Sequence, residues 1–253
     1  MRDHALEDLG GSVVMGGGGA LTSPTHTPHG AKFTTAQACG LGLQQCQDIG
    51  GPAEAINKEK EKGRCFAFDG RHGSLTVKLA DAAASGGLTP FAFTLEHLNK
   101  VFSEQGGGSA PNTFNVYGYE DSAALSAAAA ALQKKAKKAK EAAVARAKKE
   151  AAVAAAGEEG GQQEAAAAAT EEEGGEVVAE EEEESEEEKA VYGIPLIVGG
   201  VYDIDAANPV QTFYDLEVGA KKQPIRYVRL EVTSNHGNPD YTCLYRFRVH
   251  SAP

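Results

Sequence analysis

The chain has 253 residues, enough for one domain of ordinary size with an insertion or for two small domains. Its formal charge of −12 argues against general nucleic-acid binding. No stretch reaches the ~18 apolar residues needed to span a bilayer, and the start lacks the charged-then-apolar pattern of a secretion signal. The four cysteines are too few for a disulfide-built scaffold and lack the paired spacing of a zinc site, which leaves one long-range bridge open.

Short segments that combine β-branched or aromatic residues with polar ones at nearly alternate positions are typical of half-buried strands. Val228, Leu230 and Val232 fall on one face in this way, and so do Tyr245, Phe247 and Val249. We expect the intervening arginines and Glu231 to point to water. In chain order the predicted strands are residues 75–79, 91–95, 113–119, 210–214, 225–233 and 242–250. Gly and Pro separate them, which favours a mainly β fold, an antiparallel β-sandwich.

Residues 122–156 are mostly Ala with paired Lys and contain no Gly or Pro, which predicts one long helix. At about 1.5 Å per residue it would extend roughly 50 Å. Leu125, Leu132, Val144 and Val153 are too sparse to form a core-facing stripe. We interpret the helix as solvated, with a coiled coil or a basic contact surface as alternatives.

Residues 157–188 consist largely of Gly, Ala and Glu and contain no basic residue. Such a run repels itself and buries too little apolar area to offset the entropy of ordering, so we predict disorder. Residues 122–189 together hold 9 Lys or Arg and 17 Asp or Glu, which is −8 of the chain's −12. We interpret the acidic run as a solvated spacer. Folding back on the basic helix and recruitment of a basic partner are the alternatives.

Catalytic motifs are missing from the sequence. It has no Gly-x-Ser-x-Gly elbow and no Gly-x-x-x-x-Gly-Lys loop, so we predict that the protein is not an enzyme. His26 and His29 flank prolines in a polar stretch without further ligands nearby, and we interpret them as surface-loop histidines.

The C-terminal residues 238–250, NPDYTCLYRFRVH, closely resemble the ending of SUN domains, the nuclear-envelope modules that bind KASH peptides. Further blocks match in the same order: ALE at 5–7, GGSVV at 10–14, GRCFAF at 63–68, TLEH at 94–97, SAP at 109–111 and VQTF at 210–213. The resemblance covers roughly residues 5–121 and 190–253. It implies a galactose-binding-like, jelly-roll sandwich made of residues 1–121 and 190–253, with residues 122–189 inserted in a surface loop between two strands.

The resemblance also implies a binding site. A peptide's C-terminal carboxylate only accepts hydrogen bonds, so its pocket must supply donors. The family positions that receive it correspond to Ser109, Tyr241 and Tyr245, with His97 nearby. Alternation along one strand would place Tyr241, Cys243 and Tyr245 on a shared face. Ordinary core tyrosines are the alternative for the two phenols.

Cys65 and Cys243 match the pair that forms the family's intramolecular disulfide, which requires an oxidising compartment such as the perinuclear lumen. Two free buried thiols are the alternative. The residues from Pro52 to Arg64 correspond to the family's cation loop, where backbone carbonyls hold a potassium-like ion.

The sequence departs from the family pattern at several positions. Thr22 stands where animal SUN domains carry a cysteine that bonds to KASH. Cys39 and Cys46 lie inside the expected KASH lid, the hairpin that pairs with the peptide, where they could pair with each other or replace the missing link. Phe66 and His236 occupy positions where tryptophan is usual, which predicts less buried area there.

The family implies a LINC-complex adaptor at the inner nuclear membrane that faces the lumen and binds KASH tails as a homotrimer. The family's transmembrane helix and coiled coil precede the domain, so we expect the sequence to be a fragment, an incomplete gene model or a truncated soluble form. The alternatives are a SUN-like protein of the endoplasmic reticulum that maintains membrane proteins without KASH, or a carbohydrate-binding module.

Overall fold

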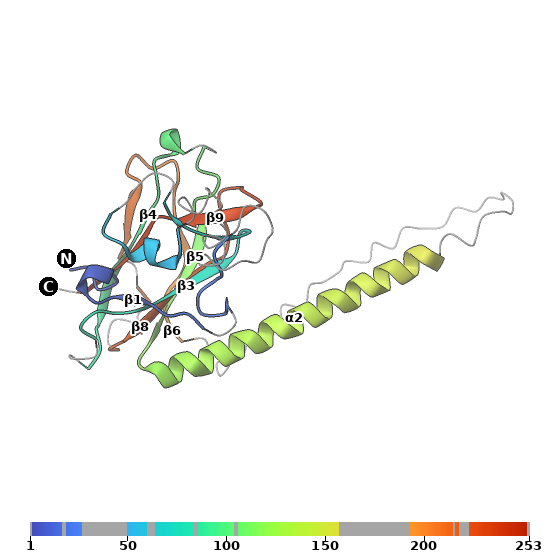
Figure 1. The fold of residues 1–253 in the computed structure, drawn as a ribbon, viewed down its shortest axis with the longest axis horizontal. Helices are drawn as coiled ribbons and strands as arrows, with labels where there is room; N and C mark the ends of the chain where they lie inside the picture. Colours follow the sequence, from blue (N-terminus) through green and yellow to red (C-terminus); the bar gives the residue numbers. More distant parts are fainter. Residues whose placement is uncertain are drawn as a thin grey trace, which may run out of the picture.

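Two antiparallel sheets form the body of the molecule (Figure 1). The computed structural model describes residues 2–16, 19–26, 50–59, 64–82, 86–103, 106–156, 193–214, 216–217 and 223–251. The larger sheet has the order β1 (Ser12–Val13), β3 (Gly73–Lys78), β8 (Tyr227–Val232), β5 (Thr113–Tyr119), β6 (Ile194–Val201). The smaller has the order β10 (Arg246–Ser251), β4 (Pro90–Glu96), β7 (Val210–Phe213). The predicted mainly β, antiparallel sandwich of jelly-roll type is confirmed.

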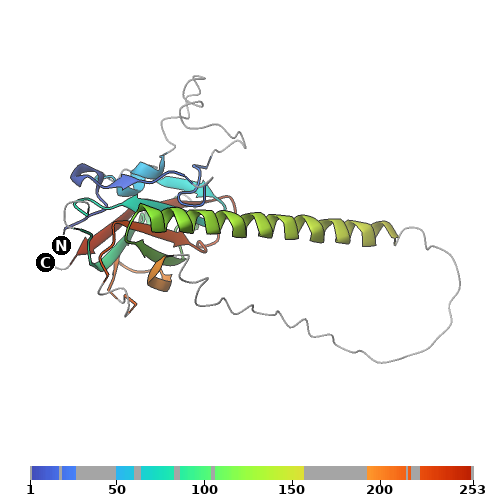
Figure 2. The same ribbon diagram turned by 90° about the horizontal axis from the view of Figure 1, so that it is seen from below.

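A two-stranded ribbon of β2 (Phe66–Asp69) and β9 (Tyr241–Leu244) stands beside these sheets. The described 3₁₀ turns are η1 (Glu7–Leu9), η4 (Pro52–Ile56) and η5 (Lys100–Phe102). The two ends of the chain meet, because the N–H of His4 donates to the Val249 carbonyl at 2.8 Å. Figures 1 and 2 show the termini side by side.

The core lies between the two sheets, where the alternate residues of each strand meet. Phe93 of β4 and Phe247 of β10 stack in parallel, with ring centroids 6.0 Å apart. From the larger sheet the inward residues are Leu75, Val77, Phe114, Val116, Val228, Leu230 and Val232, and all are at most 1% exposed. The predicted alternation of residues 228, 230 and 232 is therefore confirmed.

The prediction that the intervening arginines point to water is wrong for two of them. Arg229 is only 5% exposed and pairs with Glu231 at 2.9 Å, because other segments cover the outer face of the larger sheet. The side chain of Arg246 is 11% exposed and lies 3.4 Å from Asp3.

The predicted strand 242–250 is two strands. β9 pairs with β2 and β10 pairs with β4, so the chain changes sheets at Tyr245. Tyr245 consequently leaves the face that Phe247 and Val249 share, and it packs in a separate cluster with Cys65 and Cys243.

Helix α2 (Ser122–Ala156) follows the predicted range and leaves the sheet between β5 and β6. These strands are antiparallel neighbours, with Gly118 opposite Ile194, so α2 begins in the connection between two paired strands. The interpretation of α2 as solvated is wrong for its first turns. Leu125, Ala128 and Ala129 are buried against the outer face of the sheet.

Beyond those turns α2 extends away from the sandwich (Figure 2). No helix among the described residues combines the length and apolar content needed to cross a membrane. The predicted disorder of residues 157–188, and the lid with Cys39 and Cys46, lie outside the described residues.

Candidate functional site

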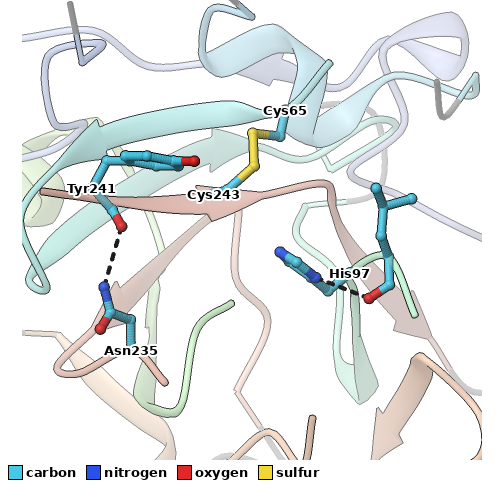
Figure 3. The surroundings of a disulfide bond; sticks show 6 residues. Cys65, His97, Asn235, Tyr241 and Cys243 are labelled. Atoms are coloured by element: carbon cyan, nitrogen blue, oxygen red, sulfur yellow. Dashed lines mark hydrogen bonds between the residues drawn. A yellow bond between two sulfur atoms is a disulfide. The ribbon is translucent and has the colours of Figure 1, made fainter. Parts of the chain in front are cut away.

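A disulfide joins the two strands of the ribbon (Figure 3). Cys65 directly precedes β2 and Cys243 lies in β9, where it is paired with Ala67, so the ladder brings the two cysteines together. Their Cα atoms are 5.7 Å apart and their sulfurs are bonded, which confirms the predicted pairing. The backbone N–H of Cys243 donates to the carbonyl of Ser109 at 2.8 Å, so Ser109 is fixed beside the disulfide.

Tyr245 and His97 lie together on one side of the disulfide. The His97 ring meets the Tyr245 ring edge-on, with centroids 5.0 Å apart. His97 is 1% exposed, and its Nδ1 donates to the Leu98 carbonyl at 3.0 Å, which sets the orientation of the imidazole. Tyr245 and Ser109 are each 6% exposed. The structure therefore brings Ser109, His97 and Tyr245 together around Cys243.

Tyr241 lies on the other side of the disulfide from His97 (Figure 3). Its half-buried ring stacks on His26, with centroids 5.3 Å apart and planes inclined by 22°. The Nδ1 of His26 is 2.5 Å from Oδ1 of Asp69. A shared face was expected for Tyr241, Cys243 and Tyr245. In the structure Cys243 and Tyr245 belong to one buried cluster, and the partly buried Tyr241 packs against it.

His26 lies in a loop and its side chain is 21% exposed, which agrees with its interpretation as a surface-loop histidine, but it also makes contacts that the sequence does not predict. Its backbone N–H donates to the Ala67 carbonyl at 2.8 Å, and Thr25 forms a bridge with Phe68, so the segment lines the edge of β2. No local signal could reveal a ring contact between His26 and Tyr241. His29 lies outside the described residues.

Asn235 organises the turn that leads into β9, a role that sequence reasoning missed. Its buried Nδ2 donates to the carbonyls of Asn238 at 2.7 Å and Tyr241 at 3.2 Å, and it lies 3.0 Å from the Thr242 hydroxyl. Its Oδ1 accepts from the N–H of Gly237 at 3.0 Å. The Asn-His-Gly-Asn sequence signals a turn, but it does not show which side chain points inward.

Residues 94–97, the TLEH block, connect β4 to the C-terminal strand β10 and lead into the site. Thr94 and Glu96 lie on β4, which pairs with β10. The Glu96 carboxylate is buried and contacts the Arg248 guanidinium. Thr94 lies 2.9 Å from Nε2 of His250. The two sequence blocks therefore form one ladder, and His97 follows directly from it.

At position 22 the chain has Thr in place of the family's linking cysteine. Thr22 is 1% exposed, and its hydroxyl donates to the Val14 carbonyl at 2.8 Å, so it is part of the packed structure. In the loop, Arg64 pairs with Glu54 at 2.8 Å, and residues 60–63 lie outside the described part. Within the described residues no group of three or more His, Cys, Asp or Glu is placed to hold a metal ion. The monovalent cation stays a prediction.

Residues 196–253 match the family model described as Sad1 / UNC-like C-terminal. The chain is 26% identical over 255 residues to SUN domain-containing protein 3 of Bos taurus and 28% identical over 258 residues to SUN domain-containing protein 1 of Homo sapiens. Each alignment covers 100% of this chain, which spans 47% and 22% of those proteins. A family 32 carbohydrate-binding module from Streptococcus pneumoniae EndoD aligns with a TM-score of 0.46 and 10% identity, over 99% of this chain and 100% of that one. The resemblance is therefore confirmed: the chain is a relative of the SUN domain-containing proteins, with a Sad1/UNC-like region at residues 196–253.

Proposed function

We propose that this domain is an adaptor of the nuclear envelope that captures the C-terminal tail of a KASH protein. The proposal places it in the lumen as part of a LINC-type bridge, assembled as a homotrimer in the full-length protein. The observation that carries it is the convergence of Ser109, His97 and Tyr245 beside the Cys65–Cys243 disulfide, with Tyr241 on the other side of the sulfurs.

The chemistry of the site suits a carboxylate. Each free oxygen of the peptide terminus accepts hydrogen bonds, and the hydroxyls of Ser109, Tyr241 and Tyr245 are neutral donors. In the proposed mechanism His97 positions the Tyr245 ring through their edge-on contact. The disulfide limits the motion of the wall that carries these groups. Upstream residues of the tail would pair as an added strand with the lid.

The decisive experiment is a binding titration with a labelled KASH-tail peptide. The Tyr241→Phe, Tyr245→Phe double variant removes both phenol hydroxyls while it keeps the rings, and affinity should fall by at least about tenfold. Tyr214→Phe is the matched control, because Tyr214 is 50% exposed and lies outside this site. Amidation of the peptide's C-terminus, or one added residue, should weaken binding to a similar extent.

Equal affinity of the wild type and the double variant would exclude the pocket. A folded protein that binds no KASH tail would instead favour the role in the endoplasmic reticulum. A potassium-like ion in the loop 52–64 belongs to the proposal through the family resemblance alone, and no step of the mechanism depends on it.

A further inference from the structure

A cleft separates helix α2 from the outer face of the larger sheet, and the proposed function does not use it. Its volume is about 660 Å³, within the range of small-ligand sites. The helix lines it with Leu132, Ala136, Lys137 and Lys140, and the sheet contributes Arg229 and Glu231. The cleft belongs to the insertion as much as to the sandwich.

The docking of α2 explains the cleft. Leu125, Ala128 and Ala129 hold the first turns against the sheet. A straight helix then diverges from a twisted sheet, and the residues from Leu132 onward face the resulting space. The opening is therefore a property of the packing of the first turns.

The charges of the cleft favour an anion. Arg229 is 95% buried and lies 2.9 Å from Glu231, and its Nε has no hydrogen-bond partner among the described residues. Lys137 and Lys140 add two positive charges at the edge, where Glu141 approaches Lys137 only to 4.0 Å. One carboxylate thus offsets Arg229, and the lysines leave the cleft cationic.

The rest of α2 indicates what kind of anion fits. The helix carries eight Lys or Arg against two Glu, and at 100° per residue they surround it. Without an apolar face it is poorly suited to lie on a membrane. It has no aromatic residue on which bases could stack. A cleft of about 660 Å³ is too small to enclose a nucleic-acid duplex. An extended acidic peptide could fill the cleft and continue along the helix.

We propose that the cleft binds a glutamate-rich polypeptide segment, whose carboxylates contact Lys137, Lys140 and Arg229. The apolar stems of the peptide's glutamates pack on Leu132 and Ala136. The recognition is by charge and by the width of the cleft, so several glutamate-rich sequences should bind.

The test is a polarisation titration of the full chain with a labelled nonapeptide, EEEEESEEE. The Lys137→Gln, Lys140→Gln variant should bind roughly fivefold or more weakly than the wild type. The matched control is Lys135→Gln, Lys138→Gln, which removes the same charge from the opposite side of α2 at 100° per residue and should lose less than half as much. Both pairs are exposed, and circular dichroism verifies that each variant keeps the helix.

Two results would overturn the proposal: equal loss in both variants, which indicates diffuse charge attraction, or tighter binding of single-stranded DNA of equal length. The chain itself contains EEEEESEEE at residues 180–188, so a further full-length variant carries Gln for Glu180 to Glu184. If this variant binds the added peptide more tightly than the wild type does, the chain's own glutamates compete for the cleft, which supports the proposal. Absence of binding by both forms would refute it.

Discussion

The Asn235 side chain forms hydrogen bonds with four groups around the entry to β9. Its amide donates to the Asn238 and Tyr241 carbonyls and is 6% exposed. Asn235→Ala leaves these acceptors buried without that donor, and we expect the free energy of unfolding to fall by about 1–3 kcal/mol. Urea unfolding measures the change. Asn208→Ala removes a single bond from an exposed cap and should cost clearly less. Equal losses would contradict the role of Asn235.

His250 predicts how stability depends on pH. It is 6% exposed, its Nε2 accepts from the Thr94 hydroxyl and its Nδ1 donates to the Arg2 carbonyl. Burial lowers the pKa of His250 below 6.5, with Arg248 adding to the effect, while Asp3 and the Arg2 carbonyl oppose it. Burial likewise lowers the pKa of His4.

Below pH 6.5 the unfolded chain therefore binds protons that the folded chain resists, and stability should fall as the pH drops from 7.5 to 5.5. His250→Gln should reduce this slope, although its own stability at pH 7.5 is lower. Urea titrations at both values provide the measurement. An unchanged slope would show that His250 does not control it.

The first turns of α2 allow a matched comparison between adjacent alanines. Ala128 is fully buried and Ala127 is exposed. Ala128→Glu forces a carboxylate into the contact with the sheet and should cost about 2–3 kcal/mol or detach these turns. Ala127→Glu should change stability by less than about 0.5 kcal/mol. Hydrogen exchange of residues 122–132 locates the effect, and equal protection in both variants would contradict the docking.

The sequence predicted a strand or a helix correctly where a single pattern, such as alternation or an Ala-rich composition, continued over the whole segment. Alternation gave β5 at residues 113–119 with the observed bounds, and the Ala-rich composition gave α2. Alternation failed at Tyr245, because the pattern continues while the chain passes from one sheet to another. β6 was missed because Pro195 and two glycines interrupt its β-branched residues.

The site was predictable from the family resemblance and much less so from the residues alone. Cys65 and Cys243 could be paired because both lie in matching blocks. The contacts of His26 with Tyr241 and of Asn235 with β9 depend on which long-range segments meet, which composition does not encode. The burial of Arg229 has the same origin, since α2 and other segments cover that face.

At the scale of the whole molecule, the two parts of the chain that flank the insertion are held together by strand pairing and by a disulfide. β3 and β5 pair with β8, β4 pairs with β10, and the disulfide joins β2 to β9. Only the disulfide persists when the chain unfolds. Its contribution to stability is therefore exerted on the unfolded state.

The Cys65–Cys243 bond closes a loop of 178 residues. In the chain-entropy model its loss costs about 5 kcal/mol, comparable with the whole stability of a small domain. We expect reductant to lower the urea midpoint strongly in the wild type. The Cys39→Ser, Cys46→Ser control keeps this disulfide and should respond to reductant in the same way, whereas Cys65→Ser, Cys243→Ser should start at the lower midpoint and not respond. A control that no longer responded would assign the effect to the other two cysteines and leave the ribbon without a stabilising role.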